Sequence, residues 1–374
     1  MRTTSLVLVL VAGVPAAGCV IDGSGDASTE SDPTTGGDPS TGSSSGGGGQ
    51  VGGSTYDAGG AVAEMVATNT HLFTISGFDV RRIELATGES VVLSTVEDGF
   101  PTKLALEGSE LIWMETIGDE GSVIRKIPSD AAPGTASELL VSDGYSTTFA
   151  VSETTVYYPL EFAIRSVPIA GGAATDVYTA DDGPGTGFHM GGFDFDRTNR
   201  MLVYYEGTGI FSLDEAGGAP QARILEAHPD GGIYGLVEVP FAGSVAWMEC
   251  EDPSQGLRFF ESTYLAQSAP KNRVAWVPQI NPFIQCPWMT TTFGTNPDEI
   301  TAYFVVNQDD GMGGDEWKAY AGSFDFGTSS SAEPREFGPA DAFSLGPVAT
   351  NDDYVFLAAE VGVEHLIYAY PRPI

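Results

Sequence analysis

Carboxylate side chains are the groups of this sequence best suited to chemistry, since the chain holds 51 Asp and Glu residues against 16 Lys and Arg. In residues 307–316 they gather around flexible glycines, with Asp309, Asp310 and Asp315 close together. Clustered oxygens on a turn are the ligands that calcium prefers, so these three residues are candidate calcium ligands. Their spacing does not match an EF-hand loop, and in so acidic a chain we favour a solvated hairpin loop.

The sequence contains no residue pattern that supports a particular catalytic reaction. Residues 42–46 match the nucleophile pattern G-x-S-x-G, and residues 47–52 match a relaxed phosphate-binding glycine pattern. Both fall in a Gly/Ser-rich stretch, whereas their chemistry requires a strand before them and a helix after them. H-E-x-x-H, P-loop and C-x-x-C patterns are absent, and the four histidines are far apart. We therefore predict no catalytic residue and no cofactor, with calcium as the one candidate ion.

Aromatic side chains near the longest insertion could contact a ligand. Trp276, Phe283 and Trp288 lie in or beside residues 251–287, where an irregular chain could present their rings to a sugar or a peptide. Packing between structural units explains them equally well, and we favour packing.

The N-terminus has the layout of an export signal over residues 1–18. Arg2 precedes an apolar run at residues 6–11, which is too short to remain as a membrane span. The small residues Ala16, Ala17 and Gly18 before Cys19 resemble the lipobox of bacterial lipoproteins. The resemblance implies that Cys19 is acylated and anchors the chain to the cell envelope, with the outer membrane as the expected site. An ordinary signal peptide is the alternative.

A tether and one disulfide are expected beyond the signal. Residues 19–54 are nearly all Gly, Ser, Thr, Asp and Pro, a composition that cannot bury a core and so predicts a disordered tether. Its typical reach is roughly 30–35 Å. If Cys19 carries lipid, Cys250 and Cys286 remain, and an even pair in an oxidising compartment predicts a disulfide. Two unpaired thiols are the alternative.

The net charge of −35 argues against anionic partners. Such a surface repels nucleic-acid phosphates and anionic lipid headgroups, so we expect no nucleic-acid partner and membrane contact only through the lipid anchor. The expected partner is an envelope protein or an extracellular ligand.

Residues 55–374 repeat a pair of strands seven times. The first strand of each pair is an aromatic or β-branched run, and a short turn joins it to an alternating second strand, which predicts a hairpin. Trp113, Tyr158, Tyr204 and Trp247 hold equivalent places, 45, 46 and 43 residues apart. The first strands are expected at residues 72–75, 111–114, 156–158, 202–205, 245–248, 300–304 and 354–357, and the second strands at 80–85, 123–127, 164–169, 209–213, 257–261, 317–320 and 366–370.

Glycine turns after these hairpins, as in residues 168–178 and 213–225, resemble the repeats of TolB-like and YWTD-type propellers and of many myxobacterial lipoproteins. The resemblance implies an all-β, β-propeller fold. The last repeat lacks an outermost strand, so we predict that residues 50–58 complete it and that the ring has seven blades. A six-bladed ring with one irregular repeat and a pair of β-sandwiches are the alternatives.

Two functions are consistent with this architecture. The first is a lipid-anchored, non-catalytic binding or protein-interaction module. The alternative is a calcium-dependent, lactonase-like hydrolase that holds its cation in the central channel. Glu64, Asp194, Asp196 and Glu238 are candidate ligands for that cation, because each lies at or near an expected inner strand.

Overall fold

The computed structural model describes residues 54–372, with gaps at 119–120, 147, 161–162, 180–192, 207–208, 225–236, 239–242, 250–257, 264–271, 276–284, 294–298, 310–314, 326–329 and 332–333. One compact unit spans Gln50–Ile374. The predicted signal peptide, Cys19 and the tether lie outside the described residues. Within the described part, no helix is long and apolar enough to cross a membrane.

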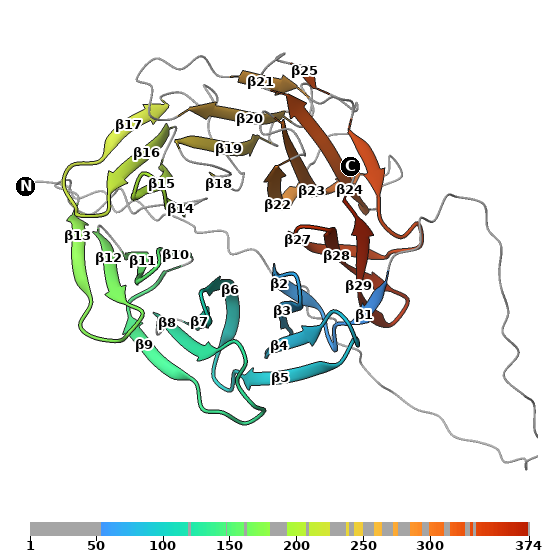
Figure 1. Ribbon diagram of the computed structural model, residues 1–374, viewed down its shortest axis with the longest axis horizontal. Coiled ribbons are helices and arrows are strands. Elements are labelled where there is room, and N and C mark those ends of the chain that lie inside the picture. The colour runs from blue at the N-terminus through green and yellow to red at the C-terminus, as the bar shows by residue number, and fades with distance from the viewer. Residues whose placement is uncertain are drawn as a thin grey trace, which may run out of the picture. The chain divides into compact units, whose positions relative to one another are not determined.

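The described strands form seven antiparallel sheets, each starting from a strand at the centre of the ring in Figure 1. Blades 1 to 4 comprise β2 (Val62–Ala67), β3 (His71–Ser76), β4 (Asp79–Glu84) and β5 (Ser90–Thr95); β6 (Phe100–Glu107), β7 (Glu110–Ile117), β8 (Gly121–Pro128) and β9 (Glu138–Asp143); β10 (Ala150–Val151), β11 (Thr155–Leu160), β12 (Ala163–Pro168) and β13 (Thr175–Thr179); and β14 (Phe193–Asp196), β15 (Met201–Glu206), β16 (Gly209–Asp214) and β17 (Gln221–Ile224).

Blades 5 to 7 follow the same plan. They comprise β18 (Val237–Glu238), β19 (Ser244–Glu249), β20 (Arg258–Thr263) and β21 (Asn272–Ala275); β22 (Gln285–Phe293), β23 (Glu299–Asp309), β24 (Asp315–Asp325), β25 (Ser330–Ser331) and β26 (Arg335–Phe337); and β27 (Ser344–Thr350), β28 (Tyr354–Val361), β29 (Glu364–Pro371) and β1 (Thr55–Asp57). The inner strands contact one another in the series β22, β27, β2, β6, β10, β14 and β18. The predicted all-β propeller is confirmed.

Each predicted hairpin is the second and third strand of a blade, from β3–β4 in blade 1 to β28–β29 in blade 7. The equivalent aromatic residues Trp113, Tyr158, Tyr204 and Trp247 are all at most 1% exposed. They are buried because each blade packs its face on the next: Phe73 and Ile75 of blade 1, for example, share a core with Trp113 of blade 2. The aromatic residues therefore recur in the sequence because each blade buries one against its neighbour.

The N-terminal strand closes the ring, as predicted. β1 pairs antiparallel with β29, with Thr55 opposite Tyr368 and Asp57 opposite Leu366. Blade 7 is thus built from both ends of the domain, and no edge of β29 is left open along the paired residues. The pairing brings residues 55 and 368 together, so it ties the ring through a contact that spans almost the whole domain.

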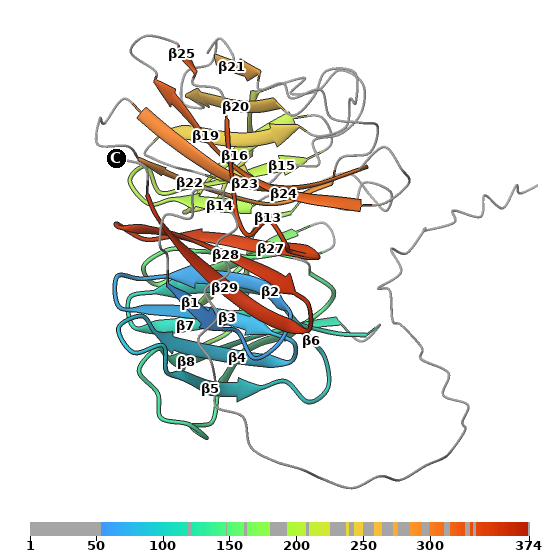
Figure 2. The same cartoon turned by 90° about the vertical axis from the view of Figure 1, so that its right-hand side faces the viewer.

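The blades present two faces, because successive antiparallel strands turn at alternate ends (Figure 2). We call one the proximal face. It holds the turns between the innermost strand of each blade and the next strand, including Asn69, Arg200 and Asn351, and the chain enters β1 from this side. There the side-chain amide of Asn69 donates a 2.6 Å hydrogen bond to Asp352 in the turn of blade 7. The opposite, distal face holds the turns between second and third strands and the connections between blades, including Phe78, Phe100 and Phe343.

Candidate ligand-binding channel

The inner strands surround a central channel of about 660 Å3. Residues of β2, β6, β10, β14, β22 and β27 line it, and most are small or apolar. The charged residues among those that line it are Glu64, Lys103, Asp194 and Arg197. Among the described lining residues, these four are the ones that could select a ligand by charge.

Four of the inner strands carry a β-bulge toward the distal end. The register shifts just before Glu64 in β2, Lys103 in β6, Trp288 in β22 and Val348 in β27. A bulge adds one residue to a strand and so changes the direction of the side chains that follow it. All four residues that follow the bulges line the channel. The bulges thus set which side chains face the channel.

Glu64 and Lys103 form an ion pair across blades 1 and 2. The Lys103 Nζ lies 3.9 Å from the Glu64 Oε2, and both side chains are partly buried. Burial raises the pKa of Glu64, while the positive charge of Lys103 and a backbone hydrogen bond at Met65 oppose that rise. Burial therefore disfavours the charged form of Glu64 more than Lys103 and the backbone hydrogen bond favour it.

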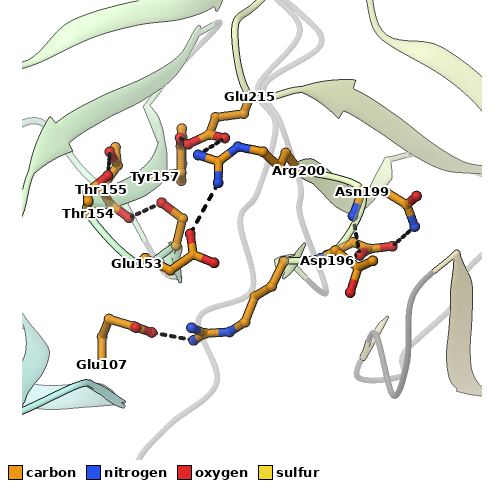
Figure 3. Close-up of polar contacts among 12 residues, drawn as sticks. Glu107, Glu153, Thr154, Thr155, Tyr157, Asp196, Asn199, Arg200 and Glu215 are labelled. Atoms are coloured by element: carbon orange, nitrogen blue, oxygen red, sulfur yellow. Dashed lines mark hydrogen bonds and ion pairs between the residues drawn. The ribbon is translucent and has the colours of Figure 1, made fainter.

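A second ion pair reaches across the proximal side of the channel. Arg197, in the turn after β14, pairs with Glu107 at the end of β6. This hydrogen-bonded contact raises the pKa of Arg197, against its partial burial. Figure 3 shows Glu107 pointing at its partner from the strand of a different blade. Two ion pairs therefore lie along the channel: Glu64–Lys103 toward the distal end and Glu107–Arg197 toward the proximal end.

Asp196 is a structural residue. Its carboxylate accepts hydrogen bonds from the backbone N–H groups of Thr198 and Asn199 (3.0 Å each) and from the Asn199 side chain (2.9 Å). It also accepts a 2.6 Å bond from the N–H of Gly243 in blade 5. At 1% exposure, this carboxylate caps its own turn, as Figure 3 shows at Asn199, and it joins two blades through Gly243.

The same turn, residues 197–200, also takes part in a polar network between blades 3 and 4. Arg200 has a φ of 53°, a left-handed conformation that is uncommon outside glycine. Its guanidinium pairs with Glu215 at 2.5 Å and with Glu153 at 3.4 Å, and Glu215 also accepts a 2.8 Å bond from the Tyr157 hydroxyl (Figure 3). Burial, then the bond to Glu215, raises the pKa of Tyr157 to about 12. The ion pairs link Arg200 of blade 4 to Glu153 of blade 3.

The structure separates the residues that the sequence grouped as candidate channel ligands. Glu64 and Asp194 line the channel, whereas Asp196 is used within the fold. Glu238 lies on the inner strand β18 opposite Ala246, but its side chain is not among those described. Sequence reasoning missed Lys103 and Arg197, although bases on inner strands or their turns are a usable signal in a chain with only 16 Lys and Arg.

The predicted calcium loop is the tip of the β23–β24 hairpin. Asp309 and Asp315 are opposite each other in register. Asp310 and the side chains of Asp309 and Asp315 lie outside the described residues, so this site stays a prediction. Among the side chains that are described, no group of three His, Cys, Asp or Glu residues could hold a metal ion.

The predicted disulfide also stays a prediction. Cys286 lies on β22, but its side chain and the whole of Cys250 are outside the described part of the chain. Trp276 and Phe283 lie outside it as well. Trp288 is half-buried and lies beside the channel, in contact with Trp317.

Comparison with known proteins identifies a fold and no family. No known family and no curated protein matches the sequence. A chain of the mitotic checkpoint complex is similar in structure, with a TM-score of 0.60 and 10% identity over 86% of this chain and 95% of that chain. The likeness shows the fold alone. PorZ, a bacterial surface component of the type-IX secretion system of Porphyromonas gingivalis, has a TM-score of 0.52 and 11% identity over 86% of this chain and 39% of its own. A chain of a nidogen/laminin complex has a TM-score of 0.46 and 11% identity over 72% of this chain and 94% of that chain.

Proposed function

We propose that this chain is a lipid-anchored module of the bacterial cell envelope that binds a partner protein through its distal face. The observation that carries the proposal is the location of the exposed apolar side chains. Of the seven large hydrophobic residues that are exposed in the described part, five lie on the distal face: Phe78, Phe100, Tyr145, Phe343 and Val363. Their exposed fractions run from 51% to 93%. Gathered apolar side chains on one face are a mark of an interaction site.

Two of these residues occupy the same place in neighbouring blades. Phe78 and Val363 each follow a glycine with positive φ, Gly77 at 60° and Gly362 at 66°, in the turn between the second and third strands. Such a two-residue turn needs the glycine, but it needs no apolar residue after it. The Phe78 ring lies 5.3 Å, centroid to centroid, from that of Phe100 in blade 2. Apolar residues at turn tips that the fold does not require support a role in binding.

The direction of the chain fits display from a membrane. The backbone enters β1 from the proximal side, where the N–H of Ala369 bonds the carbonyl of Ser54 at 2.9 Å. A lipid on Cys19 and a flexible tether before β1 would leave the distal face free to meet a partner. PorZ, which shares this fold, is itself a bacterial surface component.

The calcium-dependent hydrolase gains no support from the channel. Lys103 and Arg197 place positive charge beside the carboxylates that would hold the cation. A cation would have to displace these bases or be repelled by them.

Site-specific photo-cross-linking in intact cells tests the proposal. A photoreactive amino acid would be placed at Phe78, Phe100 or Phe343, and as matched controls at the exposed Leu139 and Tyr354, which lie off the distal face. We expect one common protein adduct from the distal positions and none from the controls, and loss of the chain from the membrane fraction in Cys19→Ser. Equal labelling from all five positions would contradict a distal interface, and membrane retention of Cys19→Ser would contradict the lipid anchor.

A further inference from the structure

A second, smaller cavity lies between blades 6, 7 and 1, and it shares Trp288 with the lining of the channel. It has a volume of about 220 Å3. Its lining includes Trp288, Trp317, Ser344, Glu360 and His365, and the remaining residues around it are apolar or glycine. Because Ser344 begins β27 and His365 lies at the start of β29, the cavity is at the distal end of these strands.

Two tryptophans form one wall of the cavity. The rings of Trp288 and Trp317 lie 5.9 Å apart, centroid to centroid, at an angle of 38°. Both are half-buried and pack against the core between blades 6 and 7, so their orientation is held by the fold. Aromatic faces carry partial negative charge and attract a cation that lies over them.

A carboxylate is placed in the same cavity. Glu360 accepts a 3.2 Å hydrogen bond from the hydroxyl of Ser344, which fixes its position, and His365 is its direct cross-strand neighbour. The cavity is lined by two indole side chains, one carboxylate and one imidazole, and it has few hydrogen-bonding groups. A sugar would leave most of its hydroxyls unsatisfied here, whereas a cation with an apolar surface would match the indole rings and the carboxylate.

We propose that this cavity, which we call the tryptophan pocket, binds a trimethylammonium group. The pocket is smaller than the roughly 300–1,000 Å3 of sites for drug-sized ligands, so it admits a head group rather than a large molecule. The net charge of −35 favours accumulation of cations around the protein. The inference goes beyond the proposed function, because it concerns a small cationic group and does not require a partner protein.

Fluorine NMR of the full chain labelled with 5-fluorotryptophan tests this proposal. The five tryptophans give five signals, assigned by single Trp→Phe variants, and the probe is choline. We expect the signals of Trp288 and Trp317 to shift with a saturable dependence on choline, while those of the buried Trp113 and Trp247 stay in place. The control ligand is 3,3-dimethyl-1-butanol, which has the same shape as choline without the charge, and it should cause little shift.

Two variants then show whether choline binding depends on the carboxylate in the pocket or on the negative charge of the protein as a whole. Glu360→Gln should weaken choline binding about tenfold, which corresponds to about 1.4 kcal/mol, because it removes the negative charge beside the cation. Glu364→Gln removes the same charge from an exposed residue nearby that does not line the pocket, and should leave binding unchanged. Trp317→Phe provides a second variant that keeps an aromatic ring.

A second probe, phosphatidylcholine vesicles, distinguishes a free trimethylammonium ligand from a lipid headgroup. Shifts with choline indicate a free ligand, and shifts with vesicles alone indicate a lipid headgroup; both support a trimethylammonium site. Equal shifts with choline and its neutral analogue, equal losses in Glu360→Gln and Glu364→Gln, or no shift with either probe would overturn the proposal. None of these results bears on the cross-linking at Phe78, Phe100 and Phe343.

Discussion

The hydroxyl of Tyr56 donates a 3.1 Å hydrogen bond to the carbonyl oxygen of Leu85. Tyr56 belongs to the strand that completes blade 7, whereas Leu85 directly follows β4 of blade 1. The same ring packs 6.5 Å from that of Phe356 and is only 8% exposed. One side chain therefore joins the closing strand to both of the blades that meet at the closure.

Removing the Tyr56 side chain should open the ring at this closure. We expect Tyr56→Ala to lower the free energy of unfolding by about 3–5 kcal/mol, and Tyr56→Phe, which loses only the hydrogen bond, by about 1 kcal/mol. Urea unfolding of the two variants and of Tyr354→Phe, an exposed tyrosine of the same blade, measures the difference. Equal stability of Tyr56→Ala and the wild type would show that β1 does not hold the ring.

Alkaline pH should destabilise the domain through tyrosines that the fold buries wholly or in part. Burial raises the pKa of Tyr157, Tyr158 and Tyr370 to about 12 from an ordinary value of 10.0. Between pH 10 and 12 the unfolded chain has lost these protons and the folded chain keeps them, so stability is complete below pH 10 and falls as pH rises through 12. Urea unfolding between pH 9 and 12 measures the fall.

A matched pair of variants tests whether Tyr157 contributes to this loss of stability at alkaline pH. Tyr157→Phe should flatten the fall between pH 10 and 12, while the change at the exposed Tyr145, Tyr145→Phe, should leave it as it is. An identical pH dependence in both variants would contradict the role of Tyr157.

Replacing Glu64 should relieve a cost of burial. Its pKa is raised, so its contribution to stability is present below the unfolded value of 4.5 and is lost as pH rises through the folded pKa. We therefore expect Glu64→Gln to be more stable than the wild type at pH 7 and equal to it near pH 4. The exposed Glu89→Gln is the control. A less stable Glu64→Gln at pH 7 would mean that attraction to Lys103 outweighs the burial.

Asp196 should prove essential to the fold and independent of calcium. Asp196→Ala leaves buried donors of two blades, including the Gly243 N–H, without an acceptor, and we expect a loss of about 3 kcal/mol. Asp214→Ala, which removes an exposed carboxylate with one backbone bond at Ala216, should cost less than about 1 kcal/mol. Thermal unfolding in calcium and in chelator should give the same loss; a loss seen only in calcium would make Asp196 a metal ligand.

Calcium itself should change little. With bases beside the channel carboxylates, we expect the melting temperature of the full chain to be the same in millimolar calcium and in chelator, within about 1 °C. A rise of several degrees in calcium would favour the hydrolase alternative. Asp309→Asn, Asp310→Asn and Asp315→Asn variants would then show whether the ion binds at the β23–β24 tip.

The repeat of short strands was readable from the sequence by itself because strands and turns leave local signals. Runs such as residues 111–114 alternate with glycine turns, and the spacing of Trp113, Tyr158, Tyr204 and Trp247 reflects a burial that recurs in every blade. The closure by residues 50–58 was also readable, since a last repeat without an outer strand needs a partner for its edge.

The lining of the channel was decided by the tertiary structure alone. A bulge shifts the register by one residue and so reverses which side chains face inward, and the sequence around Glu64 or Lys103 gives no sign of it. The pairs Glu64–Lys103 and Glu107–Arg197, and the meeting of Trp288 with Trp317, join residues that the ring brings together from separate strands. Strand signals are local, whereas the charges and rings of a propeller site depend on how the blades pack, and only the folded ring fixes that.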